Sequence, residues 1–270
     1  MKEETLRKEH FKNKLTQQEI AKKYGTSRQR VNRYFQKYRI SPLKTYERNE
    51  AQELTERQMN FMIGTMFGDG CLTLVPNGVN AYLAVKHCME QRKYVEWKRD
   101  MMAGFVNCDI KSTMNTGFGV TTEQLYFRTI CHPIFSDLHT MFYDSGVKVV
   151  TNEVIDLLTP LGLATWLMDD GFRSRNHLVF STQSFTEEEL HRIQEALKKK
   201  FNLYTTLWFS KYRKGNNQKM YNLGILRKSI LDILDIIEPH IIPSMYYKIE
   251  PLIALRSGTS ETTRGTPPRG

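Results

Sequence analysis

Two segments of the chain read as buried helices that finish in a carboxylate, and this pair constrains the fold more than any other sequence feature. They are Leu54-Thr-Glu-Arg-Gln-Met-Asn-Phe-Met-Ile-Gly-Thr-Met-Phe-Gly-Asp-Gly70 and Leu158-Thr-Pro-Leu-Gly-Leu-Ala-Thr-Trp-Leu-Met-Asp-Asp-Gly171. A threonine is placed as the N-cap of each helix, with Gln58 completing a capping box in the first and Pro160 at the first helical position of the second. Both segments are apolar nearly all round, which is typical of buried helices.

The acidic end of each helix is the informative part. A carboxylate in the last turn faces the negative end of the helix macrodipole, which typically costs about 0.3–1 kcal/mol. A divalent cation reverses this effect, because Mg²⁺ prefers carboxylate and carbonyl oxygens. One Asp-Gly pair alone indicates an ordinary turn. Two copies, each closing a capped helix, favour a metal site at Asp69 and Asp170, and we expect Gly70 and Gly171 to stop the helices in the left-handed conformation.

The repeat extends beyond these two helices. Each is followed by a polar, strand-like stretch and then by an amphipathic helix, at about residues 90–105 and 187–201. Asp69 and Asp170 lie about 100 residues apart, which is too long for a solenoid repeat and suits two pseudosymmetric half-domains. Further strands are predicted at residues 124–129, 203–210 and 219–226, and further helices at 134–142 and 230–237.

The segments at residues 62–70 and 163–171 resemble the motif of the LAGLIDADG homing endonucleases. Residues 181–186 (Ser-Thr-Gln-Ser-Phe-Thr) and 239–248 (Pro-His-Ile-Ile-Pro-Ser-Met-Tyr-Tyr-Lys) add to a likeness to the single-chain, two-motif type, over about residues 54–250. The resemblance implies an α+β fold, in which two αββαββα half-domains form antiparallel saddle sheets that read a long site in the major groove of DNA.

The resemblance also implies how the two motif helices meet. They pack side by side, and small residues, here Gly64 and Gly68, allow the close approach. Thr165 and Asp169 hold the same places in the second copy.

The final aspartates of the two motifs, Asp69 and Asp170, would hold divalent metal, Mg²⁺ or Mn²⁺, over two scissile phosphates. Hydrolysis of a phosphodiester needs metal to activate water and to neutralise the leaving oxygen. Backbone carbonyls of Gly68 and Asp169 are candidates for further metal ligands.

A lysine near the end of each half assists catalysis in this family. Lys148 is the candidate in the first half, whereas the second half departs from the pattern at Glu238, so Lys219 and Lys248 are alternatives there. The cut of one strand is therefore expected to be slower than the other. Gln183 is a candidate to position water, and His87 matches it loosely in the first half, but such polar residues are equally often structural.

The N-terminal part of the chain carries most of the net charge of +10. Residues 1–50 hold 14 basic and 6 acidic side chains, and the remaining residues hold 25 and 23. Thr16 with Glu19 forms a capping box, Gly25 suits a tight turn, and Ser27 caps a second helix. This pattern resembles a helix-turn-helix whose second helix enters the major groove, and a helical hairpin with a solvated basic face is the alternative. The candidate DNA-binding residues on the second helix are Arg28, Gln29, Arg30, Asn32 and Arg33.

Basic residues also gather in strand-like stretches of the body. Residues 203–228 contain several bases and no acid, and Arg173 and Arg175 alternate as residues on one face of a strand do. A solvated basic strand is the alternative interpretation. The candidate DNA-binding residues in the body are Arg173, Arg175, Lys211, Arg213 and Lys219.

Composition sets the broad class. The chain has 270 residues, of which 40% are hydrophobic and 25% charged, as in globular proteins that bury a sizeable core. No stretch suits a membrane span or a secretory signal, and the four cysteines include no C-x-x-C pair, which together favour a cytoplasmic location, in a bacterial or phage-infected cell, or an organellar matrix. We expect a helix-turn-helix domain at 1–45, a linker at 46–53, an endonuclease domain at 54–256 with halves at about 54–152 and 153–256, and a disordered tail at 257–270.

The leading hypothesis is a sequence-specific DNA homing endonuclease that uses Mg²⁺ or Mn²⁺, is encoded within an intron and acts as a monomer on double-stranded DNA. Two alternatives stay open: a DNA-binding regulator on the same fold that has lost catalysis, and a maturase whose partner is the host intron RNA. Retention of both Asp69 and Asp170 argues against the inactive regulator.

Overall fold

The computed structural model describes residues 1–13, 15–40, 52–75, 80–117, 120–215, 217–254 and 256. The expected tail at 257–270 and most of the expected linker at 46–53 lie outside the described residues. Among these, buried apolar side chains form two clusters, a small one between Leu6 and Ile40 and a large one between Phe61 and Leu252. No helix in the described part of the chain combines the length and the apolar content needed to cross a membrane.

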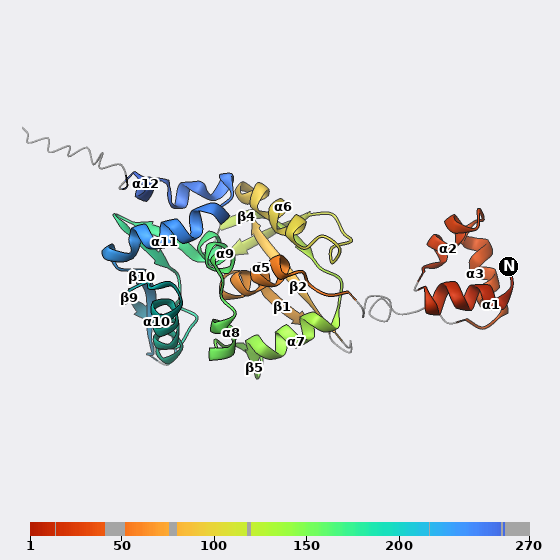
Figure 1. Ribbon diagram of the computed structural model, residues 1–270, viewed down its shortest axis with the longest axis horizontal. Coiled ribbons are helices and arrows are strands. Elements are labelled where there is room, and N and C mark those ends of the chain that lie inside the picture. Colours follow the sequence, from red (N-terminus) through yellow and green to blue (C-terminus); the bar gives the residue numbers. More distant parts are fainter. Residues whose placement is uncertain are drawn as a thin grey trace, which may run out of the picture.

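The body consists of two halves with the same order of elements, αββαββα (Figure 1), so the predicted fold class is confirmed. The sheets are antiparallel and have equivalent strand orders, β1-β2-β4-β3 and β7-β8-β10-β9. The first half comprises α5 (Glu56–Phe67), β1 (Cys71–Leu74), β2 (Ala81–Cys88), α6 (Arg92–Met101), β3 (Lys111–Gly117), β4 (Val120–Arg128) and α7 (Pro133–Phe142). The second half comprises α9 (Pro160–Asp170), β7 (Gly171–Ser174), β8 (His177–Phe180), α10 (Glu187–Phe201), β9 (Thr205–Tyr212), β10 (Lys219–Ile225) and α11 (Ile230–Ile237).

Shorter elements join and close the halves. The hairpin of β5 (Tyr143–Asp144) and β6 (Val147–Lys148) and the helix α8 (Asn152–Asp156) lead from the first half to the second. The 3-10 turns η4 (Glu238–His240) and η5 (Pro243–Lys248) and the helix α12 (Glu250–Ile253) follow α11. These closing segments carry residues of the site described below.

Local sequence signals explain where the principal helices begin. Thr55 accepts from Gln58 N and forms the predicted capping box of α5, and Thr159 accepts from Gly162 N ahead of Pro160 in α9. The predicted capping box of α10 is also present, with Thr186 as its N-cap. Each cap satisfies backbone N–H groups that the first turn of a helix leaves free.

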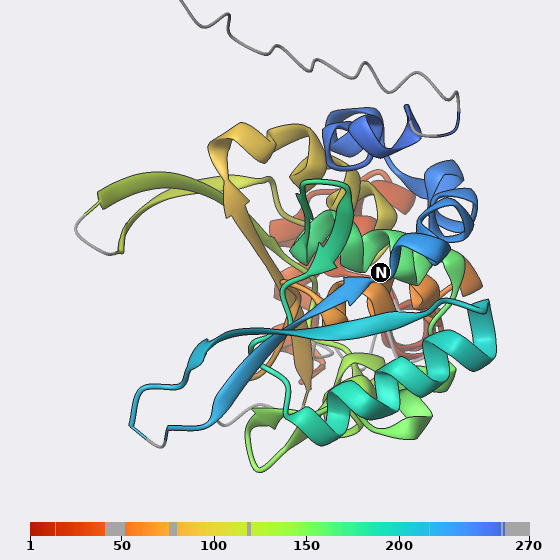
Figure 2. The ribbon, with the colours of Figure 1, turned by 90° about the vertical axis from the view of Figure 1, so that its left-hand side faces the viewer.

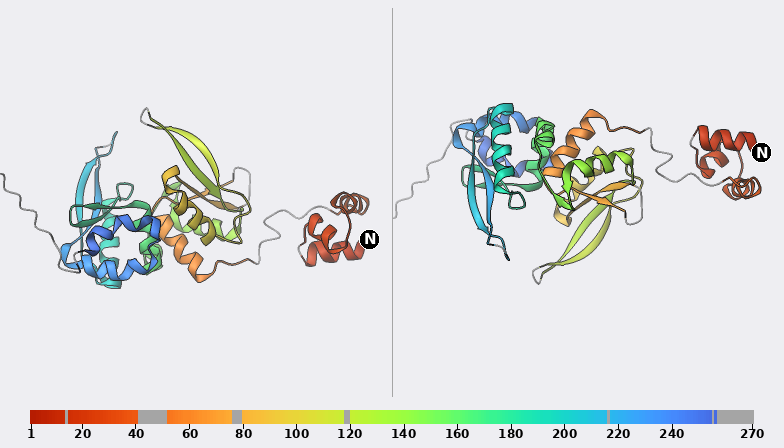
Figure 3. Two further views of the ribbon diagram at one scale, coloured as in Figure 1. Left: turned by 90° about the horizontal axis from the view of Figure 1, so that it is seen from above. Right: turned by 90° about the horizontal axis from the view of Figure 1, so that it is seen from below.

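Each sheet has one covered and one open face. Along β2, Ala81, Leu83 and Val85 are buried while the alternate side chains point to the other face, as the two-residue period of a strand requires. The helices lie on one side of the body, and the long hairpins β3–β4 and β9–β10 project from it on the opposite side (Figures 2 and 3). This arrangement agrees with the expected pair of saddle sheets.

The N-terminal residues form a small helical unit. The predicted helix pair is present as α2 (Gln17–Lys23) and α3 (Arg28–Lys37), with the Thr16 capping box, the Ser27 cap, and Gly25 at φ +58° in the turn. The structure adds α1 (Glu3–Arg7) and a turn of π-helix (Lys8–Lys12), which the sequence patterns did not indicate. Leu6 on α1 is fully buried against the core of the helix pair. A third helical segment thus completes this unit.

Candidate active site

The site is built where α5 and α9 cross. A Cβ added to Gly64 would overlap the carbonyl oxygen of Gly162 and lie 2.7 Å from Thr165 Cβ. A Cβ added to Gly68 would overlap the side chain of Asp169. Both glycines therefore permit the close approach that was predicted for them, and Gly162 is a third small residue in the crossing, whose part the sequence analysis did not anticipate.

Gly70 and Gly171, which follow the two aspartates, do not adopt the predicted left-handed conformation. Gly171 has φ −78°, and Gly70 is not among the glycines with positive φ, so the expected left-handed helix stops are wrong. A Cβ on Gly70 would lie 2.6 Å from Thr65 O, and a Cβ on Gly171 would lie 2.5 Å from Leu167 O. Space, rather than a left-handed conformation, requires glycine at both positions, because the chain turns back against the last helical turn.

Asp69 and Asp170 share one electrostatic environment. Burial raises the pKa of Asp170 to about 7, and the charges of Asp69 and Asp169 add to that shift. Burial and the charge of Asp169 also raise the pKa of Asp69. Burial and mutual repulsion destabilise the charged form of such carboxylates, and a bound cation stabilises it. The donor set therefore fits a hard divalent metal ion.

A lysine caps the C-terminal end of each motif helix, and it is half-buried in the first half and buried in the second. Lys148 Nζ donates to the carbonyl oxygens of Gly68 (3.2 Å) and Gly70 (2.8 Å). Lys248 Nζ donates to the carbonyl oxygens of Met168 (2.6 Å) and Asp169 (3.2 Å), and also to that of Leu167. Burial lowers the pKa of both ammonium groups, and the nearby aspartates oppose that shift. The two lysines thus occupy equivalent places and offset the negative helix ends.

The positions of Lys219 and Lys248 favour Lys248 as the lysine of the second half. Lys219 lies exposed on β10, whereas Lys248 reaches the end of α9. Glu238 accepts a hydrogen bond from Tyr246 Oη (2.6 Å) and pairs with Arg256. Lys248 thus lies at the helix end where Glu238 departs from the family pattern, and the slower cut of one strand stays a prediction.

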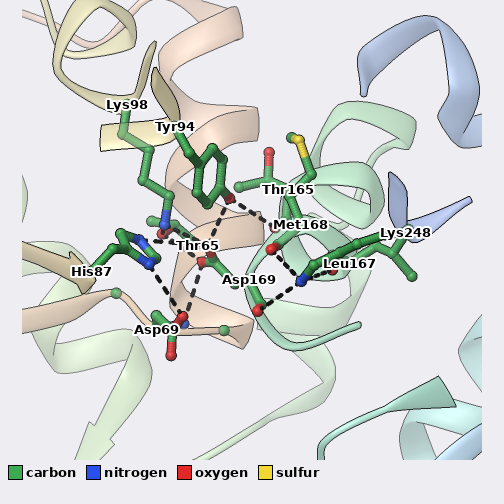
Figure 4. Close-up of polar contacts among 12 residues, drawn as sticks. Thr65, Asp69, His87, Tyr94, Lys98, Thr165, Leu167, Met168, Asp169 and Lys248 are labelled. Atoms are coloured by element: carbon green, nitrogen blue, oxygen red, sulfur yellow. Dashed lines mark hydrogen bonds and ion pairs between the residues drawn. The ribbon is translucent and has the colours of Figure 1, made fainter. Parts of the chain in front are cut away.

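Asp169 is held in a polar network that the sequence analysis missed (Figure 4). Its carboxylate accepts from Lys98 Nζ (2.5 Å) and Tyr94 Oη (2.6 Å) on α6, and from Thr65 Oγ1 (3.0 Å) on α5. Burial alone would raise the pKa of Asp169, but the charge of Lys98 with these hydrogen bonds lowers it below its usual value. One signal was present in the sequence, because Lys98 falls in the buried stripe of α6 with Tyr94 and Val95.

His87 lies between the network and Asp69. It is 6% exposed, with Nδ1 3.7 Å from Asp69 Oδ2 and Nε2 4.0 Å from Asp169 Oδ1. Burial, aided by the charge of Lys98, lowers its pKa to about 4, so the ring is neutral at neutral pH. Gln183, its loose counterpart, directs its amide nitrogen to Ser210 Oγ on β9 at 3.3 Å. The water-positioning role of Gln183 stays a prediction, as does metal binding by the carbonyls of Gly68 and Asp169, which already accept from the lysines.

The predicted DNA-binding residues of the second half lie at its strands. Lys211 and Lys219 are exposed on the β9–β10 hairpin, and Arg213 follows β9. Arg173 is exposed on β7, but Arg175 lies beyond the strand in a turn with φ +52°, so the expected alternation of the two arginines along one strand is wrong. A guanidinium nitrogen of Arg173 donates to the carbonyl of Arg175 at 2.8 Å.

The open sheet face of the first half carries a basic groove of about 580 Å³, which sequence reasoning missed. Its basic residues come from three strands, so only the sheet register brings them together: Lys86 and Lys111 both pair with Tyr126, and Ala84 pairs with Arg128. The ring of Tyr82 lies under Arg128, 5.6 Å from the guanidinium carbon. The groove adds a basic surface to the half in which the sequence analysis named no DNA contact.

The recognition candidates of the N-terminal unit are all exposed on α3, whose buried residues are Val31 and Phe35. Gln17 on α2 donates to Asn32 Oδ1 at 3.3 Å, which ties the two helices together. The exposed candidates are Arg28, Gln29, Arg30, Asn32 and Arg33.

Two matched half-domains whose paired helices end in carboxylates define a single-chain protein of the LAGLIDADG class. The model of the LAGLIDADG DNA endonuclease family matches residues 59–233, and the chain belongs to this family. The resemblance drawn from the motifs is thereby confirmed.

The relatives of the chain include proteins named as mRNA maturases and proteins named as DNA endonucleases. The chain is 27% identical over 205 residues to the cytochrome b mRNA maturase bI2 of Debaryomyces hansenii, covering 74% of this chain and 76% of that protein. It is 27% identical over 210 residues to the DNA endonuclease I-ChuI of Chlamydomonas applanata, covering 73% and 95%. Among solved structures, the homing endonuclease I-WcaI bound to its DNA recognition sequence matches 78% of this chain and 94% of its own, with a TM-score of 0.68 and 22% identity, which supports the fold.

Proposed function

We propose that this protein is a sequence-specific homing endonuclease that hydrolyses both strands of a long double-stranded DNA site with the help of Mg²⁺ or Mn²⁺. The observation that carries the proposal is the matched pair of helix ends, each with an aspartate, Asp69 or Asp170, and a lysine that donates to the end of the helix, Lys148 or Lys248. Two strands need two hydrolytic centres, and the duplicated half-domain supplies two.

The residues of the site have separable tasks. Asp69 and Asp170 would hold the divalent metal, which supplies an activated water molecule and neutralises charge on the scissile phosphate. Lys148 and Lys248 keep the helix ends in place and set positive charge beside them. The neutral ring of His87, next to Asp69, is suited to orient a water molecule in the first half.

The basic sheet surfaces would position the DNA. Lys86, Lys111 and Arg128 in the first half and Lys211 and Lys219 in the second lie on strands of the two sheets. Contacts of lysine and arginine with phosphates fix the register of a duplex, and contacts with base edges select its sequence. We propose that α3 of the N-terminal unit adds a further major-groove contact.

A plasmid assay tests the proposal. The substrate is a plasmid that carries the two exon sequences flanking the host intron joined together, and the control plasmid keeps the intron, with its reading frame, between them. With Mg²⁺, purified protein is expected to linearise the first plasmid and to leave the control intact, and EDTA should abolish the cut. Failure to cut either strand of the joined site in Mg²⁺ or Mn²⁺ would contradict the proposal.

A maturase activity is the second candidate, because relatives such as the protein from Debaryomyces hansenii are named mRNA maturases. In that case the partner is the host intron RNA. Splicing of that intron in vitro, with and without the protein, decides this point independently of DNA cleavage. We further propose that the chain works as a monomer, in the cytoplasm of a bacterial or phage-infected cell or in an organellar matrix.

A further inference from the structure

The carboxylate of Asp169 is the most densely bonded polar group at the crossing of the motif helices (Figure 4). Its side chain is 0% exposed, and each oxygen accepts two hydrogen bonds. Oδ1 accepts from Lys98 Nζ (2.5 Å) and Tyr94 Oη (2.6 Å). Oδ2 accepts from Thr65 Oγ1 (3.0 Å) and from the backbone N–H of Asp69 (3.2 Å).

Asp169 has the spacing of a metal ligand, since one ligand atom each of Asp69, His87 and Asp169 lie within 4.8 Å of one another, but its two oxygens are already occupied by these donors. Lys98 is also 0% exposed, and its ammonium group donates to Thr65 Oγ1 (3.0 Å) and lies 4.7 Å from the centre of the Tyr94 ring. A metal bound to the same carboxylate would place two cations side by side in a buried site or leave the lysine unpaired, and both are costly. Among the described residues, by contrast, no lysine or tyrosine donates to the side chain of Asp69 or Asp170, and His87 Nδ1 lies 3.7 Å from the carboxylate of Asp69.

The contact across the interface is not reciprocal: the second half supports the metal-site aspartate of the first half, but the described residues of the first half offer no equivalent support in return. Asp169 belongs to α9 in the second half, yet its carboxylate holds the backbone of Asp69, two residues beyond the end of α5 in the first half. The equivalent place in the first motif is Gly68, which has no side chain to return the contact. A Cβ there would overlap Asp169, so this glycine makes room for the carboxylate.

We propose that Asp169 is a positioning residue for Asp69, held in place by Lys98 and Tyr94, and that it makes the two centres unequal. The inference rests on the proposed endonuclease function. The centre at Asp69 depends on an anchor from the opposite half, whereas the centre at Asp170 lies on α9 itself and has no such requirement. Loss of the anchor therefore slows one strand cut selectively and converts the protein toward a nicking enzyme.

The test measures the two strand cuts separately. A duplex target labelled differently at its two 5′ ends is cut under single-turnover conditions by the wild type and by the double variant Asp169→Ala, Lys98→Met, which removes both charges together. The ratio of the two strand rates is expected to shift by at least tenfold, with DNA affinity retained. Equal slowing of both strands, or no change in the ratio, overturns the proposal.

Two further variants separate positioning from loss of stability. Tyr94→Phe removes one hydroxyl group from a buried ring, folds without difficulty, and should shift the ratio a few-fold in the same direction. Val95→Ala perturbs the next buried position of the same helix without touching Asp169, and should leave the ratio unchanged. If Val95→Ala shifted the strand ratio as much as Tyr94→Phe, the effect would come from the packing of α6 and not from the hydrogen bond to Asp169, and the proposal would fail.

Hydrogen exchange supplies a readout that needs no catalysis. The amide proton of Asp69 donates to Asp169 Oδ2, so its exchange should accelerate about tenfold or more in the double variant while core amides of α5 change little. Unchanged exchange contradicts the anchor even if cleavage changes. If the wild type cuts neither strand, the proposed function fails, whereas accelerated exchange still supports the anchor.

Discussion

The two half-domains repeat one backbone but surround their metal-site carboxylates differently. In the first half, α6 places Tyr94 and Lys98 against the crossing of the motif helices. In the second half, α10 holds the corresponding position in the order of elements, and its buried stripe includes Leu190, Ile193 and Leu197. Among the described contacts, α6 donates hydrogen bonds to a carboxylate of the motif helices, and α10 supplies no equivalent donor.

This difference follows from one residue of the second motif. Asp169 stands where the first motif has Gly68, and an extra buried carboxylate requires donors. Those donors come from the opposite half, at α6, and not from the half that carries the aspartate. A duplicated fold can therefore keep its strand order and its lysine caps while its two reactive centres acquire unequal support.

The largest effect is expected for the carboxylates that the two halves have in common. Asp69→Asn and Asp170→Asn should each lower double-strand cleavage by at least about 1,000-fold, because metal binding contributes several kcal/mol to the transition state. DNA affinity, measured by gel shift, should stay close to that of the wild type. Asp232→Asn, at an exposed position of α11, is the matched control, and undiminished cutting by both site variants would refute the assignment.

The lysine caps should respond alike in the two halves. Lys148→Met and Lys248→Met each remove donors to the last carbonyls of a motif helix, and each should slow cleavage by about 10–100-fold, as removal of a supporting group at a metal site does. Single-turnover rates measure this. Lys219→Met, at the exposed start of β10, should weaken DNA binding without slowing the cut of bound DNA. If Lys248→Met left the cleavage rate unchanged and Lys219→Met lowered it, Lys219 and not Lys248 would be the supporting lysine of the second half.

Alanine substitutions of the two glycines at the helix crossing should have smaller effects, on stability, and the two effects should differ. Gly64→Ala places a methyl group into the Gly162 carbonyl and against Thr165, and should lower the free energy of unfolding by about 1–3 kcal/mol. Gly162→Ala is the matched variant, since its Cβ would find its nearest neighbours at 3.2 Å, and it should cost less. Urea unfolding monitored by tryptophan fluorescence tests both, and equal losses would contradict the crossing geometry.

The smallest effect on chemistry is expected outside both halves. Deletion of residues 1–45 removes the exposed basic face of α3, so DNA binding should weaken and its salt dependence should flatten. Cleavage of saturated DNA should keep its rate and its strand ratio. Binding measured between low and moderate salt, beside single-turnover cleavage, checks this, and a changed strand ratio would show that the N-terminal unit acts on one centre.

Local chemistry made the architecture predictable. Thr55, Thr159 and Thr186 start their helices by bonds to residues three positions away, so a short stretch of sequence carries the whole signal. The stops were mispredicted because Gly70 and Gly171 are fixed by space against Thr65 and Leu167 rather than by φ. Local pattern gives the turn but not the packing around it.

The site was only partly predictable because its supporting contacts are distant in sequence. The aspartates follow from the repeat, but Lys98 meets Asp169 across 71 positions, and Lys248 reaches Met168 across 80. No spacing rule connects such pairs. A lysine in the buried stripe of α6 was the one local sign that a partner had to exist.

The Lys98–Asp169 pair has a consequence for recombination between relatives. A chimera that joins this first half to a foreign second half with glycine or alanine at position 169 would bury an ammonium group without its carboxylate. Two copies of the first half, paired as a homodimer, would bury two such groups. Exchange of half-domains is therefore restricted to donors that bring an acid at this position, or it must be accompanied by an apolar substitution of Lys98.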